Sequence, residues 1–317
     1  MKIPVIVLFA PTATGKTALA LKLFGKGSLS FFNGKCELIS ADSMQVYRGF
    51  DIGTAKPTLE EQSQLVHHLI DIKNMDEQFT ACDFVSSADK LCEDIFNRGY
   101  IPLVAGGTGF YIRNFLLGMP ETPPSDEKVK EILKRRLERE GLQALYDELL
   151  KVDGESASKI DRNDAFRIIR SLEIFLITGK PRSSFEMPSR LREKYDFLIL
   201  VLEKERKVLY DRINLRVEQM FNQGLEQEVR KLVEKGASRQ MPAMQAIGYR
   251  QWLDYPVWDS ETVERIKSDI QHDSRKYAKK QCTFMKNIPG ALYLNADDED
   301  RLFEEVSHKI HEFMANL

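Results

Sequence analysis

The sequence predicts an α/β protein in which a parallel sheet, flanked by helices, is interrupted by an all-helical insertion. Strand and helix signals alternate along the first 120 residues, as they do in βαβ units. No strand candidate occurs between residues 121 and 195, and a continuous apolar run then returns at Phe197–Leu202. We therefore divide the chain into a core, residues 1–120 and 196–317, and an insertion, residues 121–195.

Strands of the core are expected where short apolar runs are bounded by turn residues. The long runs predict buried parallel strands at Ile3–Phe9, Glu37–Ala41, Ile101–Ala105 and Phe197–Leu202. Shorter runs predict two further strands, at Leu69–Ile72 and Leu292–Leu294.

Helices are expected between these strands and throughout the insertion. In the core they follow Thr17 and Thr80, the second reaching about Arg98, and later span Arg206–Asn222, Leu225–Lys235 and Ser260–Lys286 before a final helix. In the insertion, Ser125 can cap a charged helix over Asp126–Glu140, which Gly141 breaks. A second helix carries leucines 142, 145, 149 and 150, and a third runs from near Asp164 to Gly179.

Composition describes an ordinary globular chain of 317 residues, with 43% apolar residues and a net charge of −2. No apolar run approaches a membrane span, and the N-terminus lacks the layout of a secretory signal. Four widely spaced cysteines indicate inert thiols rather than a zinc site. We expect a cytoplasmic monomer without membrane contact. The near-neutral charge argues against a general nucleic-acid coat, so any nucleic-acid surface must be local.

The most informative motif lies between the first strand and the first helix. Backbone N–H groups of such a loop surround a phosphate at the positive end of a helix, and a lysine adds a full charge. Ala10 replaces the usual first glycine, which is tolerable if its φ is negative. The motif predicts a P-loop NTPase-like core and a phosphate site made by Ala10, Pro11, Thr12, Ala13, Thr14, Gly15, Lys16 and Thr17.

Two further segments follow predicted strands, at the sheet edge where open α/β sheets bind ligands. Asp42 comes directly after the second strand and could be a general base, a metal ligand or simply a helix cap. Gly106-Gly107-Thr108 follows the Ile101–Ala105 strand and could admit a ligand or be a plain turn. That strand end carries no acidic residue, which disfavours ordinary ATP-driven chemistry.

The helix over Ser260–Lys286 has two contrasting faces. Ile266, Ile270, Tyr277 and Phe284 form an apolar stripe, whereas Arg275, Lys279 and Lys286 fall on the opposite one, beside Lys276 and Lys280. The nearby acids, Asp269 and Asp273, lie toward its N-terminal half. We favour contact with nucleic-acid phosphates over a merely solvated lysine face.

Other basic residues stay open between two interpretations. Arg167 and Arg170 could grip a nucleic-acid backbone or make local ion pairs with Asp164 or Glu173. Arg212 and Arg216, four residues apart on a helix, could reach a diphosphate or remain on the surface. His67 and His68 are interpreted as structural rather than metal-binding.

Together these segments resemble one family over almost the whole chain, the tRNA dimethylallyltransferases, also called tRNA isopentenyltransferases. The resemblance rests on the phosphate loop and on an ordered block that general P-loop proteins do not share. The segments that carry it are residues 10–17, Ile39–Ser43, Tyr47–Pro57, Gly106–Thr108, Gly248–Arg250 and Ala278–Thr283.

The resemblance implies transfer of a dimethylallyl group from dimethylallyl diphosphate to the N6 amine of the adenosine on the 3′ side of a tRNA anticodon. Lys16 would stabilise the leaving diphosphate, Thr17 would hold Mg²⁺, and Arg216 and Arg212 would add bonds to the same group. Asp42 would be the general base. Thr108 would contact the donor diphosphate or the tRNA at the mouth of the crevice. The adenosine would be flipped out of its stack to reach this site.

The resemblance also implies which residues contact the tRNA anticodon stem-loop. One departure is that Lys286 stands where an arginine is common, which keeps the charge but weakens any bidentate contact. The implied contacts are Asp42, Ser43, Met44, Gln45, Thr108, Lys130, Phe166, Arg167, Ile168, Ile169, Arg170, Gln245, Ala246, Ile247, Gly248, Tyr249, Arg250, Lys279, Lys280, Gln281, Cys282, Thr283, Phe284, Met285 and Lys286.

Three alternative functions stay open. An adenylate isopentenyltransferase would share the donor site and the base, but it should need neither the basic helix nor the insertion. A small-molecule P-loop kinase would be expected to carry an acid after a core strand. An RNA-binding protein without catalysis would explain the basic helix but not the phosphate loop with Asp42.

Overall fold

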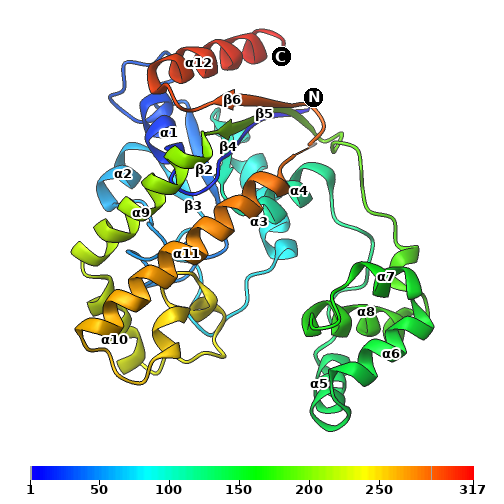
Figure 1. The fold of residues 1–317 in the computed structure, drawn as a ribbon. Helices are drawn as coiled ribbons and strands as arrows, with labels where there is room; N and C mark the ends of the chain where they lie inside the picture. The colour runs from blue at the N-terminus through cyan, green and yellow to red at the C-terminus, as the bar shows by residue number, and fades with distance from the viewer. Residues whose placement is uncertain (1, 287) are drawn as a thin grey trace. The chain divides into compact units, whose positions relative to one another are not determined.

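The computed structural model describes residues 2–286 and 288–317, which form two compact units, Met1–Leu116 with Leu191–Leu317 and Leu117–Arg190. The first unit, the core, contains one sheet of parallel strands in the order β3-β2-β4-β1-β5-β6 (Figure 1). Its strands are β1 (Ile3–Phe9), β2 (Cys36–Ala41), β3 (His67–His68), β4 (Ile101–Gly106), β5 (Tyr195–Glu203) and β6 (Ala291–Asn295). The predicted α/β fold with a parallel sheet is confirmed.

Helices cover both faces of this sheet, as an all-parallel sheet requires. On one face, α1 (Lys16–Phe24) and α12 (Glu299–Ala315) contact each other and share a core with the strands. On the other face lie α3 (Ala81–Asn97) and α4 (Gly109–Leu117). There Phe115 packs against Phe197 of β5, with ring centroids 5.8 Å apart.

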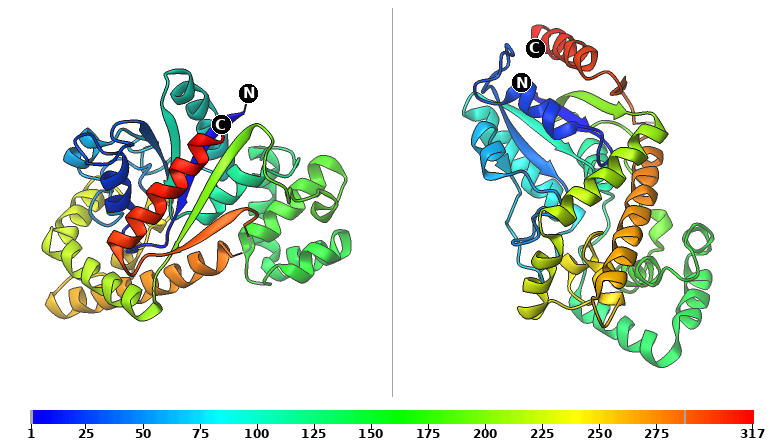
Figure 2. Two further views of the ribbon diagram at one scale, coloured as in Figure 1. Left: turned by 90° about the horizontal axis from the view of Figure 1, so that it is seen from above. Right: turned by 60° about the vertical axis from the view of Figure 1, so that its left-hand side comes forward.

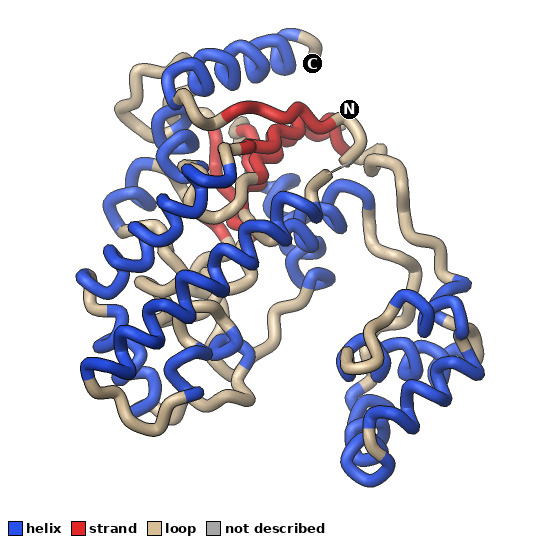
Figure 3. The backbone as a smooth tube through the Cα atoms, viewed as in Figure 1, coloured by secondary structure: helices blue, strands red, loops and turns tan. Residues whose placement is uncertain are grey.

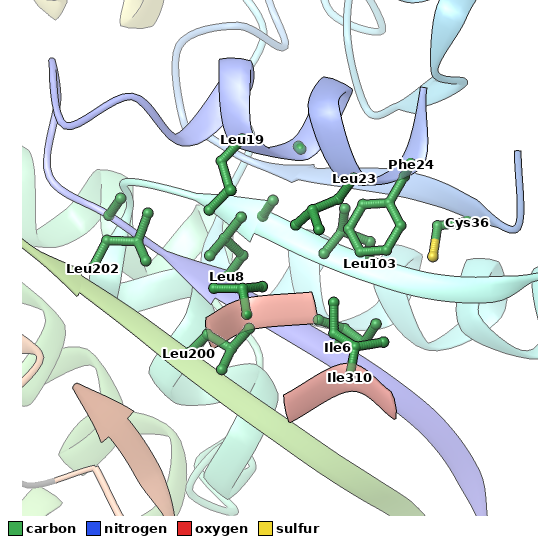
Figure 4. Packing of buried hydrophobic residues seen from close by; sticks show 14 of the residues in the cluster. Ile6, Leu8, Leu19, Leu23, Phe24, Cys36, Leu103, Leu200, Leu202 and Ile310 are labelled. Carbon is green, nitrogen blue, oxygen red and sulfur yellow. The ribbon is translucent and has the colours of Figure 1, made fainter. Parts of the chain in front are cut away.

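The core beneath α1 and α12 follows the two-residue period of the strands. Ile6 and Leu8 of β1 and Leu200 of β5 point to the same side, where Leu23 and Ile310 meet them (Figure 4). These side chains are almost fully buried. Their removal from water fixes the register of β1 against its neighbours, so the loop that follows β1 is held at the carboxyl edge of the sheet.

The C-terminal part of the core is helical apart from β6. Helix α9 (Arg206–Asn222) packs along α11 (Ser260–Phe284), and α10 (Leu225–Glu234) follows α9 (Figures 1 and 2). The chain then makes two short 3-10 turns, η2 (Pro242–Gln245) and η3 (Arg250–Asp254), before α11 begins. Asn214 of α9 accepts a hydrogen bond from Arg275 of α11, so this arginine of the predicted basic face is engaged.

The second unit, Leu117–Arg190, contains helices and loops and no strand among its residues (Figure 3). Its helices are α5 (Glu127–Glu140), α6 (Leu142–Val152), α7 (Gly154–Lys159) and α8 (Ala165–Thr178), followed by the turn η1 (Arg182–Ser184). They enclose a small core of their own around Leu133, Leu149 and Leu172. The boundaries differ from the predicted 121–195, because β5 begins at Tyr195 rather than Phe197.

Two local predictions were wrong. Leu69–Ile72 is not a strand, since Leu69 and Asp71 adopt left-handed φ values of 63° and 55°; the strand is His67–His68 instead. Ser125 does not cap α5, because its hydroxyl donates to Glu173 while Asp126 accepts the first N–H groups. In addition, the sequence reading missed α2 (Leu59–Gln64), although Thr58 and Glu61 form a capping box there.

Candidate active site

The loop between β1 and α1 has the predicted form of a phosphate cradle. Gly15 caps α1 with a φ of 108°, a left-handed conformation that favours glycine, and Lys16 opens the helix. Ala10 is buried, is not among the residues with positive φ, and donates its N–H to the Gly106 carbonyl. The replacement of glycine by Ala10 is therefore free of backbone strain. Ala13 instead takes the left-handed φ, at 63°.

Three charged side chains converge on this loop. Burial lowers the pKa of Lys16, with the Asp42 carboxylate acting in the opposite direction and the Arg216 guanidinium in the same one. Burial likewise lowers the pKa of Arg216. Lys16 and Arg216 thus carry two buried positive charges, and the single Asp42 carboxylate balances only one of them. An excess of buried positive charge favours the binding of an anion such as a diphosphate.

The two arginines of α9 reach the phosphate loop, and their contact with a diphosphate stays a prediction. Arg216 donates to the Thr12 hydroxyl over 3.2 Å, and Arg212 donates to the Ala13 carbonyl over 3.0 Å. Arg212 also pairs with Glu299, so its charge is partly neutralised. The Thr14 hydroxyl is buried and finds no hydrogen-bond partner in the part of the chain that the structure describes. A ligand or water at the loop would satisfy it.

Asp42 follows β2 at the same edge of the sheet, and the two oxygens of its carboxylate have different surroundings. Its Oδ1 accepts the backbone N–H groups of Met44 and Gln45, at 2.8 and 3.2 Å, within a turn. No helix follows before α2 in this fully described stretch of the chain, so the helix cap that we considered is not formed. Its Oδ2 accepts no hydrogen bond from residues 2–286 or 288–317. One oxygen thus fixes the orientation of the carboxylate.

Thr108 lies beside this carboxylate loop. Its Oγ1 accepts the Ser43 N–H over 3.0 Å, while its own N–H donates to the Ala41 carbonyl. A Cβ at Gly106 would stand 2.1 Å from the Ala41 carbonyl oxygen, so the glycine is required by the close approach of β2 and β4. The segment is therefore more than a plain turn, because it ties the Asp42 loop to the sheet edge.

Gln281 of α11 connects the two loops at this edge. Its side-chain carbonyl accepts the Thr12 N–H over 3.1 Å, and its amide donates to the Gly107 carbonyl over 2.7 Å. The side chain is buried. We predicted Gln281 as a tRNA contact, but its amide is already engaged inside the protein, and it acts here as a clamp between the phosphate loop and the Thr108 segment.

The ordered block over 47–57 is a scaffold behind Asp42. The Glu228 carboxylate of α10 accepts N–H groups from Asp51, Ile52 and Gly53, and the Tyr249 hydroxyl donates to it. A Cβ at Gly53 would lie 2.5 Å from the Tyr249 ring. The block in turn supplies the carbonyls of Thr54 and Ala55 to the Gln45 amide. Its unusual sequence is thus explained by packing and by an internally filled anion nest.

The basic face of α11 is confined to its second half. Within residues 2–286 and 288–317, the salt bridges of this helix involve Arg265, Lys267 and Asp273. Lysines 276, 279, 280 and 286 are exposed and outside these pairs. The predicted apolar stripe is buried only in its first half, at Ile266 and Ile270. Tyr277 and Phe284 are each 37% exposed, and they lie near Thr108 and Gly109 respectively.

Some predicted tRNA contacts cannot act through their side chains in this conformation, because those side chains lie inside the protein. The buried members of the set are Ile168, Ala246, Tyr249, Gln281 and Met285. In the insertion, Arg167 pairs with Asp164 and Arg170 with the buried Glu173, and Lys130 pairs with Glu127. The local ion pairs that we left open therefore exist. Phe166, by contrast, is 77% exposed.

His67 and His68 are structural, as interpreted. The Nδ1 atom of His67 lies 2.6 Å from the Leu65 carbonyl, and Nε2 of His68 lies 2.7 Å from the Glu37 carboxylate. Burial lowers the pKa of His67. Among the residues described, no group of three or more His, Cys, Asp or Glu side chains is arranged to hold a metal.

The donor set near the phosphate loop nevertheless suits Mg²⁺. This ion keeps several waters and binds mainly phosphate oxygens, with one or two protein ligands. Thr17, in the first turn of α1, offers a hydroxyl beside Lys16. The residues present therefore fit an ion that arrives with a diphosphate, and they do not form a metal centre of their own.

Sequence reasoning missed three functional positions. Tyr277 was assigned to a buried stripe, Gln281 to the tRNA surface, and Glu228 to no role. Helical periodicity placed all three on helices, but it does not reveal that α11 crosses the carboxyl edge of the sheet. A buried glutamine on an otherwise charged helix was the one available signal.

Fold and site together define a P-loop protein whose sheet edge joins a diphosphate cradle to an anchored carboxylate. A family model described as "IPP transferase" matches residues 45–288. The tRNA dimethylallyltransferase of Halalkalibacterium halodurans is 40% identical over 324 residues, covering 99% of this chain and 98% of that protein. That of Protochlamydia amoebophila is 40% identical over 300 residues, covering 93% of this chain and 85% of the relative.

Solved structures agree. The full-length tRNA isopentenylpyrophosphate transferase of Bacillus halodurans has a TM-score of 0.69 at 37% identity, covering 99% of this chain and 98% of its own. A eukaryotic dimethylallyltransferase captured acting on tRNA has a TM-score of 0.82 at 28% identity, covering 99% and 80%. This chain belongs to the tRNA dimethylallyltransferase family. No helix within the described residues is long and apolar enough to cross a membrane.

Proposed function

We propose that this protein transfers a dimethylallyl group from dimethylallyl diphosphate to the N6 amine of the adenosine that follows the anticodon in tRNA. Family membership supports the reaction. The observation that carries the assignment of roles is the placement of Lys16, Arg216 and Asp42 at one sheet edge, where the first two lie at the phosphate loop and the third keeps an oxygen free.

The bond changes can be assigned to these residues. The N6 amine attacks the C1 carbon of the donor, the C1–O bond breaks, and its electron pair leaves with the diphosphate. Lys16, Arg216 and the loop N–H groups stabilise the charge that grows on this leaving group. Asp42 accepts the amine proton at Oδ2 while Oδ1 stays bound to Met44 and Gln45.

Mg²⁺, when bound at Thr17 with the diphosphate, would neutralise part of the leaving group's charge. The chain's own contribution at that point is the Thr17 hydroxyl and the N-terminus of α1. The absence of an acid after β4 fits this proposal, since no γ-phosphoryl group is transferred.

The acceptor is proposed to dock on the exposed lysines of α11 and on the insertion. Lysines 276, 279 and 280 of α11, with Lys286 just past the end of that helix, present a cationic strip that suits a phosphate backbone. A base within a stacked anticodon loop cannot reach Asp42, so the adenosine must be flipped toward the sheet edge. The anticodon stem-loop is therefore the expected partner.

The decisive experiment supplies labelled dimethylallyl diphosphate with either unmodified tRNA or free AMP. We expect label in tRNA, at the adenosine next to the anticodon. Label in AMP alone would favour an adenylate isopentenyltransferase and contradict the proposal. Removal of Mg²⁺ by EDTA, followed by its restoration, tests the metal in the same assay.

The docking surface needs its own measurement. Exchange of Lys279 and Lys280 for Gln should weaken tRNA binding and lower the slope of log K against log salt by about 2, because two phosphates would no longer be neutralised by the protein. Exchange of Lys231 on α10 and of Lys235, which caps the end of that helix, is a charge-matched control away from this strip. An unchanged salt slope in the α11 variant would remove the strip from the proposal.

A further inference from the structure

Tyr277 stands beside the carboxylate of the site without a role in the chemistry described so far. It lies on α11 one turn before Gln281, and Phe284 follows on the same stripe. Gln281 is fixed to Thr12 and Gly107, and Phe284 packs so closely on Gly109 that a Cβ there would lie 2.7 Å from its ring. Two anchors therefore set the rotation of α11, and the third residue of the stripe must face the same edge.

The hydroxyl of Tyr277 lies at this edge. Its surroundings are the Asp42 carboxylate, the Thr108 hydroxyl and the Gln281 amide. Arg216 donates to the hydroxyl of Thr12, the residue whose N–H binds Gln281, so the phosphate loop adjoins this clamp. With 37% of its surface exposed, the side chain is accessible to a ligand that enters the crevice.

The hydroxyl is also a permanent donor. Burial, reinforced by the Asp42 carboxylate, raises the pKa of Tyr277 to about 12, against the smaller opposing effect of contacts with Thr108 and Gln281. The phenol therefore keeps its proton at any pH at which the enzyme works, and it does not compete with Asp42 as a base.

We infer that Tyr277 reads the acceptor base, with its hydroxyl donating to a ring nitrogen next to the exocyclic amine and so presenting that amine to Asp42. This inference rests on the proposed function. Adenine carries two such acceptors, N1 and N7, on either side of the amine. A neutral donor beside a carboxylate matches this edge, since the amine faces the acceptor Oδ2 and the ring nitrogen faces the O–H.

The match also excludes other bases by chemistry. Guanine presents an oxygen at the position of the amine, which would face Asp42 with its charge unrelieved. Cytosine offers an amine beside a ring nitrogen but has no second ring, and so no N7. The pair of Asp42 and Tyr277 thus forms a reader for an adenine edge, separate from the backbone contacts of α11.

The test combines enzyme and substrate changes. Tyr277→Phe removes the hydroxyl and keeps the ring, and we expect kcat/KM for tRNA to fall about 10- to 100-fold, the range for removal of one base-reading hydrogen bond. The KM for dimethylallyl diphosphate should stay within twofold. Tyr255→Phe is the matched control, because its hydroxyl bonds Asp269 in the first half of α11; it should leave kcat/KM within twofold.

Full-length tRNA carrying 1-deazaadenosine or 7-deazaadenosine at the target position completes a cycle with these variants. If Tyr277 reads N1 or N7, the corresponding deaza base should cost the wild type about as much as Tyr277→Phe, and should cost the variant little more. The ratio of wild-type to variant rates should also stay constant from about pH 6 to about pH 10.

Three outcomes would overturn the inference while leaving the proposed function intact. Fully additive losses for both deaza bases would show that the hydroxyl reads neither nitrogen. Full activity of Tyr277→Phe together with a loss in Tyr277→Leu would assign the role to the ring alone. A ratio that falls with rising pH would mean that the hydroxyl ionises. Failure of the proposed function looks different, since the wild type would then not label tRNA at all.

Discussion

Strand β2 carries a carboxylate near each end, and the two have opposite environments. Glu37, near its start, is held by Arg98 at 2.5 and 2.7 Å and by His68 at 2.7 Å. Asp42, just past its end, is held through Oδ1 alone. The hydrogen bond from Arg98, aided by His68 and opposed by burial, lowers the pKa of Glu37 to about 2.

Two cations repeat the contrast. Arg98 is saturated by Glu37 and Asp94, whereas Lys16 sits desolvated next to a second cation at the phosphate loop. Glu37 and Arg98, at the amino edge of the sheet, are paired with each other, whereas Lys16 and Arg216, at the carboxyl edge, form no salt bridge with any residue that the structure describes. Substitutions at the two edges should therefore affect different quantities, with stability at one edge and turnover at the other.

The largest effect is expected for Asp42→Asn. The amide keeps an oxygen for the Met44 and Gln45 N–H groups, so the loop should persist, but it cannot take the amine proton. We expect kcat to fall by about 10³-fold, with the free energy of unfolding unchanged. Single-turnover prenylation and urea unfolding give the two values. A variant that retains a tenth of wild-type turnover would rule out Asp42 as the base.

Lys16→Met should come next. Loss of the charge at the leaving group is expected to lower kcat by about 10²-fold. Because burial already disfavours the charged form of Lys16, the apolar replacement should fold at least as stably as the wild type. Thermal unfolding and transfer assays on the same preparation check both statements. A clear loss of stability would show that the ammonium is matched within the chain after all.

Glu37→Gln should lower the stability of the protein and leave its turnover unchanged, the opposite of the two substitutions above. The exchange breaks a pair whose carboxylate is buried, although Arg98 is partly exposed, so we expect a loss of about 2 kcal/mol in the free energy of unfolding. Prenylation should stay within twofold at a temperature where both proteins are folded. Glu93→Gln, which breaks an exposed pair with Lys194, is the control and should cost less than about 1 kcal/mol.

The smallest expected effect is on pH dependence: at acid pH the contribution of Glu37 to the free energy of unfolding should disappear. Its pKa is depressed in the folded protein, to about 2 from the ordinary 4.5, so its contribution is complete above about pH 4.5 and disappears as the pH falls toward 2. The difference in unfolding free energy between wild type and Glu37→Gln should narrow over that window. A difference that stays constant between pH 5 and pH 3 would assign it to packing instead.

Much of the core could be predicted because its signals are local. Buried parallel strands such as Ile3–Phe9 are continuous apolar runs, and Thr80 and Gly99 mark the ends of α3. The strand at His67–His68 could not be predicted, since two residues give no periodicity and their pairing with β2 is a tertiary effect. The short helix α7 was also missed in the sequence analysis, because it is held by packing within the insertion rather than by a strong sequence pattern.

The site divides in the same way. The phosphate loop is contiguous in sequence, so Lys16 and Thr17 could be found from the motif alone. Arg212 and Arg216 required the further guess that α9 returns to that loop. Tyr277 and Glu228 lie next to segments that are more than a hundred residues away along the chain, and their sequence neighbours look like ordinary helix surface. The tertiary structure, in which α11 contacts the loops after β1 and β4, is needed to identify the face of this helix that lies at the candidate site.

The chain leaves and re-enters the core at a single point, because the Arg192 N–H donates to the Leu116 carbonyl over 2.9 Å and the Arg192 side chain holds Asp89. Everything between these two residues is one detachable module with its own hydrophobic interior. Such a junction allows a segment to be gained, deleted or exchanged in one genetic event without changing the strand order of the sheet. A short linker in place of 117–190 should therefore yield a folded prenyl-diphosphate site, a practical starting point for grafting recognition of other RNAs.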